Sequence, residues 1–363
     1  MKTTKLIFKL FLLSLVFVAC NEDDSSQIED ILERFEDGII VSAEGNFGNK
    51  DGSLSFITSE YSVSTNFLYK AVNGTQLGGL IQSITFNEND AYIVLNDANS
   101  IVVVDRYTFL KKAVITTGLE NPRYMTVLNG KGYVTNWGDA ATETDDYVAV
   151  LNLETNRIDE SSHIALDNGV ERIISKNNKL FVSHKGGWSS NKIISVIEVS
   201  DNSVSKITVN DNPDTMFFIA SGELVVLCKG KPLAYGGAPD FDVSEATTSS
   251  ISFIDVSNNT VTKSLEFAEN VVGTHMSHDG NNIYYYSDTD NLVYKISESA
   301  TELASDGIDV GEIYGMTVKN NLLYTVENSF SELSKLDIID YESDSKLYST
   351  AVGLGASKIY FNE

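Results

Sequence analysis

The chain has 363 residues, of which 17 are Tyr, 17 are Phe and only 4 are Pro, a composition that favours strands over helices. Its formal net charge of −25 argues against nucleic-acid binding, which requires a basic surface, and against electrostatic attachment to anionic lipid. Small-molecule, protein and glycan ligands remain open.

The first 19 residues have the pattern of a secretory signal sequence. Lys2 and Lys5 precede an apolar run over residues 6–19 that is too short to span a bilayer. The run ends at Cys20, and Phe17-Val18-Ala19-Cys20 resembles a bacterial lipobox in which Phe17 replaces the usual Leu or Val. We expect cleavage before Cys20 and lipidation of its thiol, whereas a structural strand ending in Cys20 is the alternative. Cys228 is the only other cysteine, so once Cys20 carries a lipid no disulfide can form within the chain.

Residues 20–37 have the composition of a flexible tether. Between Asn21 and Asp37 the sequence holds eight acidic residues and a single basic one, Arg34, which leaves too little apolar surface to order the segment. The run from Asn21 to Asp24 also resembles the acidic export signal of some Gram-negative surface lipoproteins, although a plain solubilising spacer is the alternative. We expect the protein to be lipid-anchored in the outer membrane and exposed at the cell surface.

A short strand pattern recurs through the rest of the chain. Each copy follows a polar turn rich in Asn, Asp and Gly, and a second alternating strand follows each copy. The copies recur at intervals of about 40 residues, which is typical of the four-stranded blades of a β-propeller. The six copies are Ala91-Tyr92-Ile93, Gly132-Tyr133-Val134, Leu180-Phe181-Val182, Leu224-Val225-Val226, Ile283-Tyr284-Tyr285 and Leu322-Leu323-Tyr324.

The two ends of the chain complete a seventh blade. Ile39 to Val41 and Ser53 to Thr58 form a blade that lacks its first strand. Ala356 to Phe361 is a lone alternating strand, and its pairing with this blade would remove an open sheet edge. We therefore predict one all-β domain over residues 38–363, a seven-bladed β-propeller closed by pairing of its N- and C-terminal strands. A β-sandwich is the alternative, but it does not explain a period sustained seven times.

Blade topology assigns the loops to two faces. Because successive strands alternate in direction, the short turns share one face, and the longer loops share the other with the crossovers between blades. The longer loops carry both tryptophans beside amide and basic groups, as a ligand-binding mouth requires. Packing of a tryptophan between blades, or an inter-blade hydrogen bond from a crossover residue, is the alternative in each case. The candidate ligand-binding residues are Asn46, Phe47, Asn96, Asn136, Trp137, His184, Trp188, Lys229, Tyr235, Asn328 and Phe330 in the loops, and Gln82, Arg123, Arg172, His275 and Tyr314 in the crossovers.

Motifs for catalysis and for metal binding are absent from the sequence. It contains no Gly-x-Ser-x-Gly, no His-Glu-x-x-His and no phosphate-binding glycine loop. His275 and His278 lie three residues apart on an expected strand and would point to opposite faces. Asp288 to Asn291 could bind Ca²⁺ weakly, although a solvated turn is the alternative. We expect a protein that is not an enzyme and that holds no metal or cofactor.

Two motifs resemble a known family. Tyr133-Val134-Thr135-Asn136 is the tetrapeptide after which the YVTN class of β-propeller repeats is named. Glu44-Gly45-Asn46-Phe47-Gly48, followed by Gly52-Ser53-Leu54-Ser55, resembles the first blade of surface lipoproteins of that class. The resemblance extends over residues 38–363. It implies a lipoprotein that works beside a TonB-dependent outer-membrane transporter, and the class includes a branch that captures vitamin B12 (cobalamin) and another that captures ferric siderophores.

The charge of the chain bears on the choice between these ligands. A ferric catecholate siderophore is a multiply charged anion, so it would require a concentrated basic surface within a chain of net charge −25. Cobalamin is large, nearly neutral and rimmed by amides, which suits aromatic and amide side chains. We expect a monomer that captures one corrinoid and transfers it to the transporter. A protein- or glycan-binding scaffold stays open, and a siderophore stays open because of Arg123, Arg172, Lys185, Lys229 and Lys231.

Overall fold

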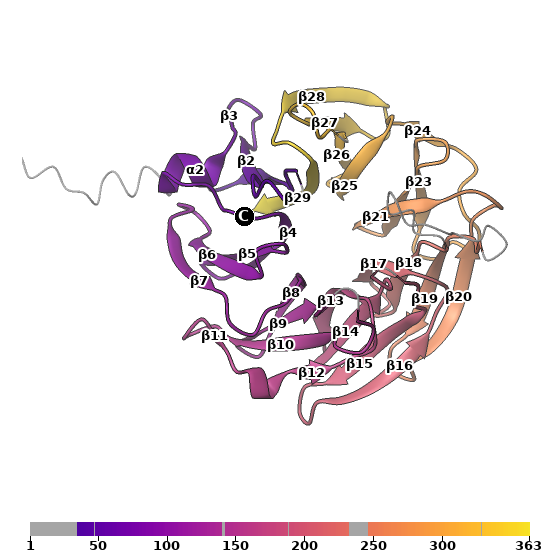
Figure 1. Cartoon of the computed structure of the whole chain (residues 1–363). Coiled ribbons are helices and arrows are strands. Elements are labelled where there is room, and N and C mark those ends of the chain that lie inside the picture. Colours follow the sequence, from indigo (N-terminus) through magenta and orange to yellow (C-terminus); the bar gives the residue numbers. More distant parts are fainter. Residues whose placement is uncertain (1–34, 47, 140–141, 188, 232–245, 328) are drawn as a thin grey trace, which may run out of the picture.

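The computed structural model describes residues 35–46, 48–139, 142–187, 189–231, 246–327 and 329–363. Within these residues the strands form seven separate antiparallel sheets, which stand as blades around a common axis (Figure 1). The prediction of an all-β, seven-bladed propeller is confirmed. The expected signal sequence and most of the expected tether, including Cys20, lie outside the described residues.

The blades are numbered in chain order, and the strands of each blade run from the axis outward. The first blade holds β29 (Ala356–Asn362), β1 (Gly38–Ala43), β2 (Ser53–Thr58) and β3 (Ser64–Thr65), and the second holds β4 (Ile81–Asn87), β5 (Asp90–Leu95), β6 (Ser100–Asp105) and β7 (Lys111–Ile115). The third holds β8 (Pro122–Leu128), β9 (Lys131–Asn136), β10 (Tyr147–Asn152) and β11 (Arg157–Ile158), with β12 (Ile164–Ala165) also paired to β10. The fourth holds β13 (Val170–Lys176), β14 (Lys179–His184), β15 (Ile193–Glu198) and β16 (Ser203–Thr208).

The remaining three blades have the same order. The fifth holds β17 (Pro213–Phe218), β18 (Leu224–Cys228), β19 (Ser250–Asp255) and β20 (Thr260–Glu266), and the sixth holds β21 (Gly273–Asp279), β22 (Asn282–Ser287), β23 (Leu292–Ser297) and β24 (Gly307–Asp309). The seventh holds β25 (Ile313–Lys319), β26 (Leu322–Glu327), β27 (Lys335–Asp340) and β28 (Ser345–Ala351). The described helices are α2 (Leu68–Asn73) and the 3₁₀ helix η1 (Glu160–Ser162), and neither is long and apolar enough to cross a membrane.

The N- and C-terminal strands close the ring, as the sequence predicts. β1 lies between β29 and β2, and its Gly38 faces Asn362 while its Ala43 faces Ala356. The buried Asn362 side chain donates hydrogen bonds to the carbonyl oxygens of Phe35 at 2.6 Å and Arg106 at 2.9 Å. These bonds tie the first blade to the second at the point where the chain enters the ring.

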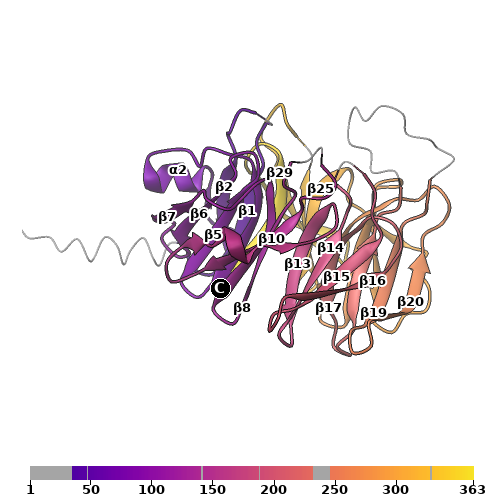
Figure 2. The ribbon, with the colours of Figure 1, turned by 60° about the horizontal axis from the view of Figure 1, so that its bottom comes forward.

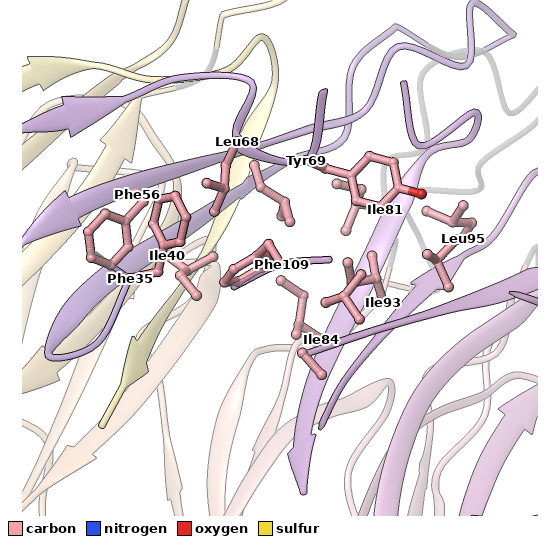
Figure 3. Packing of buried hydrophobic residues seen from close by; sticks show 14 residues of the cluster. Phe35, Ile40, Phe56, Leu68, Tyr69, Ile81, Ile84, Ile93, Leu95 and Phe109 are labelled. Carbon is pink, nitrogen blue, oxygen red and sulfur yellow. The ribbon is translucent and has the colours of Figure 1, made fainter. Parts of the chain in front are cut away.

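The hydrophobic core is divided into layers between neighbouring blades. Successive residues of a strand point to opposite sheet faces, so Ile40 packs toward the second blade while Ile39 and Val41 pack toward the seventh. Figure 3 shows the layer between the first and second blades, where the ring of Phe35 meets Phe56 edge-on at a centroid distance of 5.3 Å. Because both faces of the second strand of each blade are covered, strands such as β5 and β18 are apolar at nearly every position.

Each innermost strand carries a β-bulge near the same end. There, two consecutive residues of the innermost strand lie opposite one residue of the next strand, so both project from one end of the blade. Gly315 is required in its pair, because a Cβ atom at this position would lie 1.9 Å from the carbonyl oxygen of Ser357. The seven bulge pairs are Gln82 and Ser83, Arg123 and Tyr124, Glu171 and Arg172, Asp214 and Thr215, Thr274 and His275, Tyr314 and Gly315, and Ser357 and Lys358.

The bulges define one face of the ring, which we call the mouth face. β29 begins at this face and ends at the opposite one, and β1 runs the other way, from Gly38 to Ala43. Phe35 and Glu363 therefore both lie at the face opposite the mouth. In the tilted view of Figure 2, the innermost strands β8, β13 and β17 run from one face of the ring to the other.

Deletion of residues 356–363 is expected to destabilise the protein severely or to cause aggregation. The deletion removes β29, which exposes an edge of β1 and removes one wall of the core layer between the first and seventh blades. Thermal unfolding and size-exclusion chromatography measure the effect. The control lacks only Glu363, whose side chain is exposed. If the long deletion melts at the wild-type temperature, the termini do not close the ring.

Candidate functional site

A hollow of about 290 Å³ opens around the axis at the mouth face. All seven blades contribute to its lining, and most of the lining residues belong to the bulge pairs. Eight of the residues predicted from the sequence meet there, namely Gln82, Asn96, Arg123, Trp137, Arg172, Lys229, His275 and Tyr314. Eight further residues complete the lining, namely Glu44, Leu80, Tyr124, Glu171, Lys185, Asp214, Ser357 and Lys358.

The bulges explain why consecutive residues line the same hollow. In a regular strand Glu171 and Arg172 would point to opposite faces, but in the bulge both reach the hollow. The backbone N–H of Arg172 donates to the Ser183 hydroxyl at 3.1 Å, and that of Tyr124 donates to the Thr135 hydroxyl at 3.0 Å. A hydroxyl on the facing strand thus satisfies an N–H group that the bulge removes from the hydrogen-bond ladder.

The lining is rich in charge. It contains five cationic side chains and three carboxylates, which leaves an excess of two positive charges in a chain whose net charge is −25. The cations are Arg123, Arg172, Lys185, Lys229 and Lys358, and the carboxylates are Glu44, Glu171 and Asp214. The mouth is therefore locally positive.

Arg123 and Glu171 form a buried ion pair between the third and fourth blades. The guanidinium donates through Nε at 3.0 Å and through Nη2 at 2.8 Å to the two carboxylate oxygens. Arg123 also stacks on the Trp137 ring at 3.9 Å, and the indole N–H of Trp137 donates to the carbonyl of Val170 at 2.6 Å. Burial would raise the pKa of Glu171, but the charges of Arg123 and Lys185 hold it below its ordinary value.

Asp214 joins the fourth and fifth blades at the mouth. Its Oδ1 accepts from Arg172 Nε at 3.0 Å, and its Oδ2 lies 2.5 Å from Lys229 Nζ. Burial acts to raise the pKa of Asp214, but the charges of Lys229 and Arg172 outweigh it and hold the pKa well below the ordinary value. Burial lowers the pKa of Lys229, and the neighbouring Lys185 lowers it further. Asp214 therefore only partly offsets the repulsion among the cations.

Glu44 connects the first and seventh blades at the mouth. It accepts hydrogen bonds from Lys358 Nζ at 3.2 Å and from the Tyr314 hydroxyl at 3.1 Å. Phe330, whose side chain is exposed, packs edge-on against the Tyr314 ring at 5.6 Å. An apolar surface thus borders this side of the charged hollow.

A second hollow of about 200 Å³ shares part of the lining of the first. Arg172, His275, Ser357 and Lys358 line both hollows. Burial lowers the pKa of His275 to about 3, and the charges of Lys229, Arg172 and Lys358 contribute to the shift. His278 lies elsewhere, where it bonds Glu298 at 2.7 Å and stacks on Phe217. In the described residues, no group of three or more His, Cys, Asp or Glu side chains is placed to hold a metal ion.

Other predicted residues do not line this hollow. His184 is fully buried in β14, where its ring bonds Asn168 and Ser195, and burial lowers its pKa to about 4. Asn136 is fully buried as well and bonds the backbone of Glu120 and Val134. Asn46 and Phe330 are described but are not lining residues. Phe47, Trp188, Tyr235 and Asn328 lie outside the described residues, so their roles stay predictions.

Sequence reasoning did not select several lining residues. Glu171 stands at the same blade position as Arg123, immediately after the first residue of an innermost strand. Ser357 occupies that position in the strand that closes the ring, and Lys358 follows it as the second residue of the bulge pair. An alignment of the blades by their innermost strands would have found all of them.

A larger hollow of about 410 Å³ lies at the opposite face, between the first and seventh blades. Its lining includes Tyr61, Lys319, Tyr324 and Phe361. The mouth hollow is the better candidate despite its smaller volume, because every blade contributes to it and its charges do not cancel.

The fold is similar to that of solved proteins, at identities that show the fold alone. The periplasmic gluconolactonase PpgL of Pseudomonas aeruginosa has a TM-score of 0.63 at 12% identity, over 90% of this chain and 99% of that chain. The hydrazine synthase of Kuenenia stuttgartiensis has a TM-score of 0.59 at 16% identity, over 76% of this chain and 87% of that chain. The dihydro-heme d1 dehydrogenase NirN in complex with DHE has a TM-score of 0.54 at 13% identity, over 89% of this chain and 75% of that chain. A search of curated proteins found no match.

Glu171→Ala is expected to lower the free energy of unfolding by about 3–5 kcal/mol, because it leaves Arg123 buried without its partner. Urea unfolding at neutral pH measures the loss. The matched control is Asp167→Ala, which breaks the exposed pair with Lys206 and should cost less than about 1 kcal/mol. Because folding lowers the pKa of Glu171, the difference from wild type should shrink as the pH falls below the ordinary value of 4.5. Equal losses in the two variants would contradict the buried pair.

The sequence also matches a described family. A profile of the family described as "Domain of unknown function (DUF5074)" matches residues 37–225. The match begins at the first blade and ends in β18 of the fifth, so it covers just over half of the chain. The chain therefore belongs to the DUF5074 family.

Proposed function

We propose that the protein captures a corrinoid of the cobalamin type at the mouth of the propeller and passes it to a TonB-dependent outer-membrane transporter. The observation that carries the proposal is the hollow to which all seven blades contribute side chains. A large ligand that rests on such a hollow contacts many blades at once. Capture from dilute solution requires contact of this extent, because a few surface hydrogen bonds do not give the necessary affinity.

The side chains at the mouth match the chemistry of a corrinoid. Gln82, Asn96 and Tyr314 offer amide and hydroxyl groups to the amides that rim a cobalamin. The excess of cations suits its phosphodiester group. The exposed ring of Phe330, beside Tyr314, offers an apolar contact at the edge of the hollow. Aromatic, amide and cationic groups are thus available together.

A ferric siderophore is the second candidate, and the excess of cations in the mouth favours it. The net charge of −25 disfavours this ligand, because a siderophore requires a concentrated basic surface. The five cations of the hollow form such a surface locally. Three carboxylates offset part of it, so a ligand with one or two negative charges fits the balance better than a triply charged complex.

We further propose that the ligand is bound without chemical change. The carboxylates of the lining take part in ion pairs with Arg123, Arg172, Lys229 and Lys358. The pKa values of Glu171 and Asp214 are held below their ordinary values by the neighbouring cations, which suits electrostatic binding better than proton transfer near neutral pH. The protein acts as a monomeric binding module in this proposal.

The point at which the chain enters the ring is consistent with surface capture. The chain enters the first blade at the face opposite the mouth, where Gly38 pairs with Asn362. A lipid on Cys20 would therefore hold the ring by its far face and leave the mouth open to the medium. The transporter would then receive the ligand from the side that faces away from the anchor.

Isothermal titration calorimetry of the purified protein tests the function. We expect one cyanocobalamin per propeller with a dissociation constant at or below about 1 nM. Trp137→Ala should weaken binding by about 1–4 kcal/mol, because it removes an aromatic wall and the surface on which Arg123 stacks. Urea unfolding checks that this variant is folded.

The control variant is Tyr107→Ala, which changes an aromatic residue in the turn after β6 at the opposite face. It should bind cyanocobalamin as the wild type does. A ferric catecholate siderophore is titrated in parallel. If only the siderophore gives a heat of binding, the ligand of the mouth is a siderophore and not a corrinoid. If neither ligand gives a heat of binding, both proposed ligands are contradicted.

Cys20→Ala tests the proposed anchor. We expect the variant to move from the membrane fraction to the soluble fraction, because its thiol can no longer carry a lipid. Fractionation followed by immunoblotting measures the shift, and Cys228→Ala serves as the control because that thiol is buried in β18. Unchanged membrane association of the Cys20 variant would contradict lipidation. Protease treatment of intact cells separately tests exposure of the ring at the surface.

A further inference from the structure

Arg172 has unused hydrogen-bond donors where the two axial hollows share their lining. Within the described residues, its guanidinium makes one hydrogen bond, from Nε to Asp214 at 3.0 Å. The guanidinium lies over the Tyr124 ring, with Cζ 4.3 Å from the ring centroid, and this contact together with the bond to Asp214 restrains it. Its two terminal amino groups are thus available to an acceptor in the hollows that Arg172 lines. A fixed guanidinium with free parallel donors is suited to bind two oxygens of one oxyanion.

Lys358 contributes a second cation from the first blade to the same two hollows. Its Nζ atom contacts Glu44 Oε1 and the Ser357 hydroxyl, each at 3.2 Å. An ammonium group has three hydrogens, so one donor remains after these contacts. Lys358 thus retains a donor for a ligand in the hollows.

His275 lies within the field of both cations. Burial is the largest cause that lowers the pKa of His275, and the charges of Arg172 and Lys358 lower it further. Burial raises the pKa of the Tyr360 hydroxyl, which lines the second hollow, and the same two charges oppose that rise. Within the described part of the chain, neither ring nitrogen of His275 makes a hydrogen bond. A neutral imidazole with an N–H group can donate to an anion without a prior proton transfer.

The charges at this place do not cancel. Asp214 accepts from both Arg172 and Lys229, so one carboxylate serves two cations. Glu44 is shared in a similar way between Lys358 and the Tyr314 hydroxyl. Partly buried cations that repel one another are stabilised by an anion placed between them, because little water is present to screen them.

We propose that the axial hollows hold a phosphate-type oxyanion, bound by the terminal amino groups of Arg172 and by Lys358, with His275 as a further donor. This inference deepens the proposed function. It rests on that function only for the identity of the molecule that carries the oxyanion. In a bound cobalamin the oxyanion is the phosphodiester of the nucleotide loop. In the absence of such a ligand it is free phosphate.

Titration of the purified full-length protein with inorganic phosphate tests the site directly. NMR of the histidine rings is the readout, because the sequence has only four His and the His275→Asn variant assigns the signal of His275. Phosphate should shift the His275 signal and raise the pKa of this ring, because an anion offsets the nearby cations. A His275 signal that phosphate leaves unchanged would overturn the proposal.

Variants assign the site to its residues. Arg172→Gln and Lys358→Gln should each weaken phosphate binding by about tenfold or more, because each removes a charged hydrogen-bond donor. Lys206→Gln, at an exposed position on β16, should bind as the wild type does. Urea unfolding checks that all three are folded. Wild-type phosphate affinity in both Arg172→Gln and Lys358→Gln would overturn the assignment.

A pair of corrinoids identifies the source of the oxyanion. Cyanocobalamin carries the phosphodiester, whereas dicyanocobinamide lacks it. Arg172→Gln should lower the affinity for cyanocobalamin by a larger factor than the affinity for dicyanocobinamide, because only cyanocobalamin presents the phosphodiester to this side chain. If phosphate binds but neither corrinoid does, the result supports the oxyanion site and contradicts the corrinoid function. If cyanocobalamin binds equally well to the wild type and to Arg172→Gln, and phosphate does not bind, the result supports the corrinoid function and contradicts the oxyanion site.

Discussion

The pairing of β1 with β29 is the constraint on which the rest of the structure depends. It joins segments from the two ends of the chain, and only this pairing gives the first blade an innermost strand. The inner strands of each blade are covered on both faces by the two neighbouring blades. An open ring would therefore leave the core layer between the first and seventh blades half formed. The same pairing places Lys358 beside Glu44 and within the lining of the mouth. Closure of the ring and assembly of the site are therefore one event.

The charge distribution gives the mouth a character unlike that of the whole chain. The chain carries 51 acidic and 26 basic residues, yet five of the basic and only three of the acidic ones line the hollow. In physiological salt the field of distant charges fades beyond about 8 Å, so a ligand close to the mouth senses mainly the local excess of cations. The net negative charge of the whole chain repels polyanions such as nucleic acid. The proposed preference for a ligand with few negative charges rests on this local excess of two cations.

The sequence was sufficient for the fold and for half of the lining, and the limits have a physical cause. Alternation in strands such as Tyr133-Val134 and the lone strand at residues 356–361 predicted the blades and their closure. Period-two reasoning failed at the mouth, because a bulge brings both Glu171 and Arg172 to one side. It failed differently for Asn136 and His184, which end their strands but bond neighbouring backbone and side-chain groups instead of lining the hollow. A bulge leaves no local mark in composition, so only the comparison of all blades would have indicated it.

The seven bulges also bear on how such a ring can change its ligand over evolutionary time. A bulge residue lies outside the regular ladder, so its side chain can be exchanged with little effect on the hydrogen bonds that define the blade. A substitution at one of these positions also affects the adjacent blade, because Arg123 contacts Glu171 and Arg172 contacts Asp214 across blade boundaries. Substitutions at these positions are therefore expected to occur in complementary couples, one on each of two adjacent blades. Relatives of this chain can in this way retain the same ring while the pattern of charge that they present to a ligand differs.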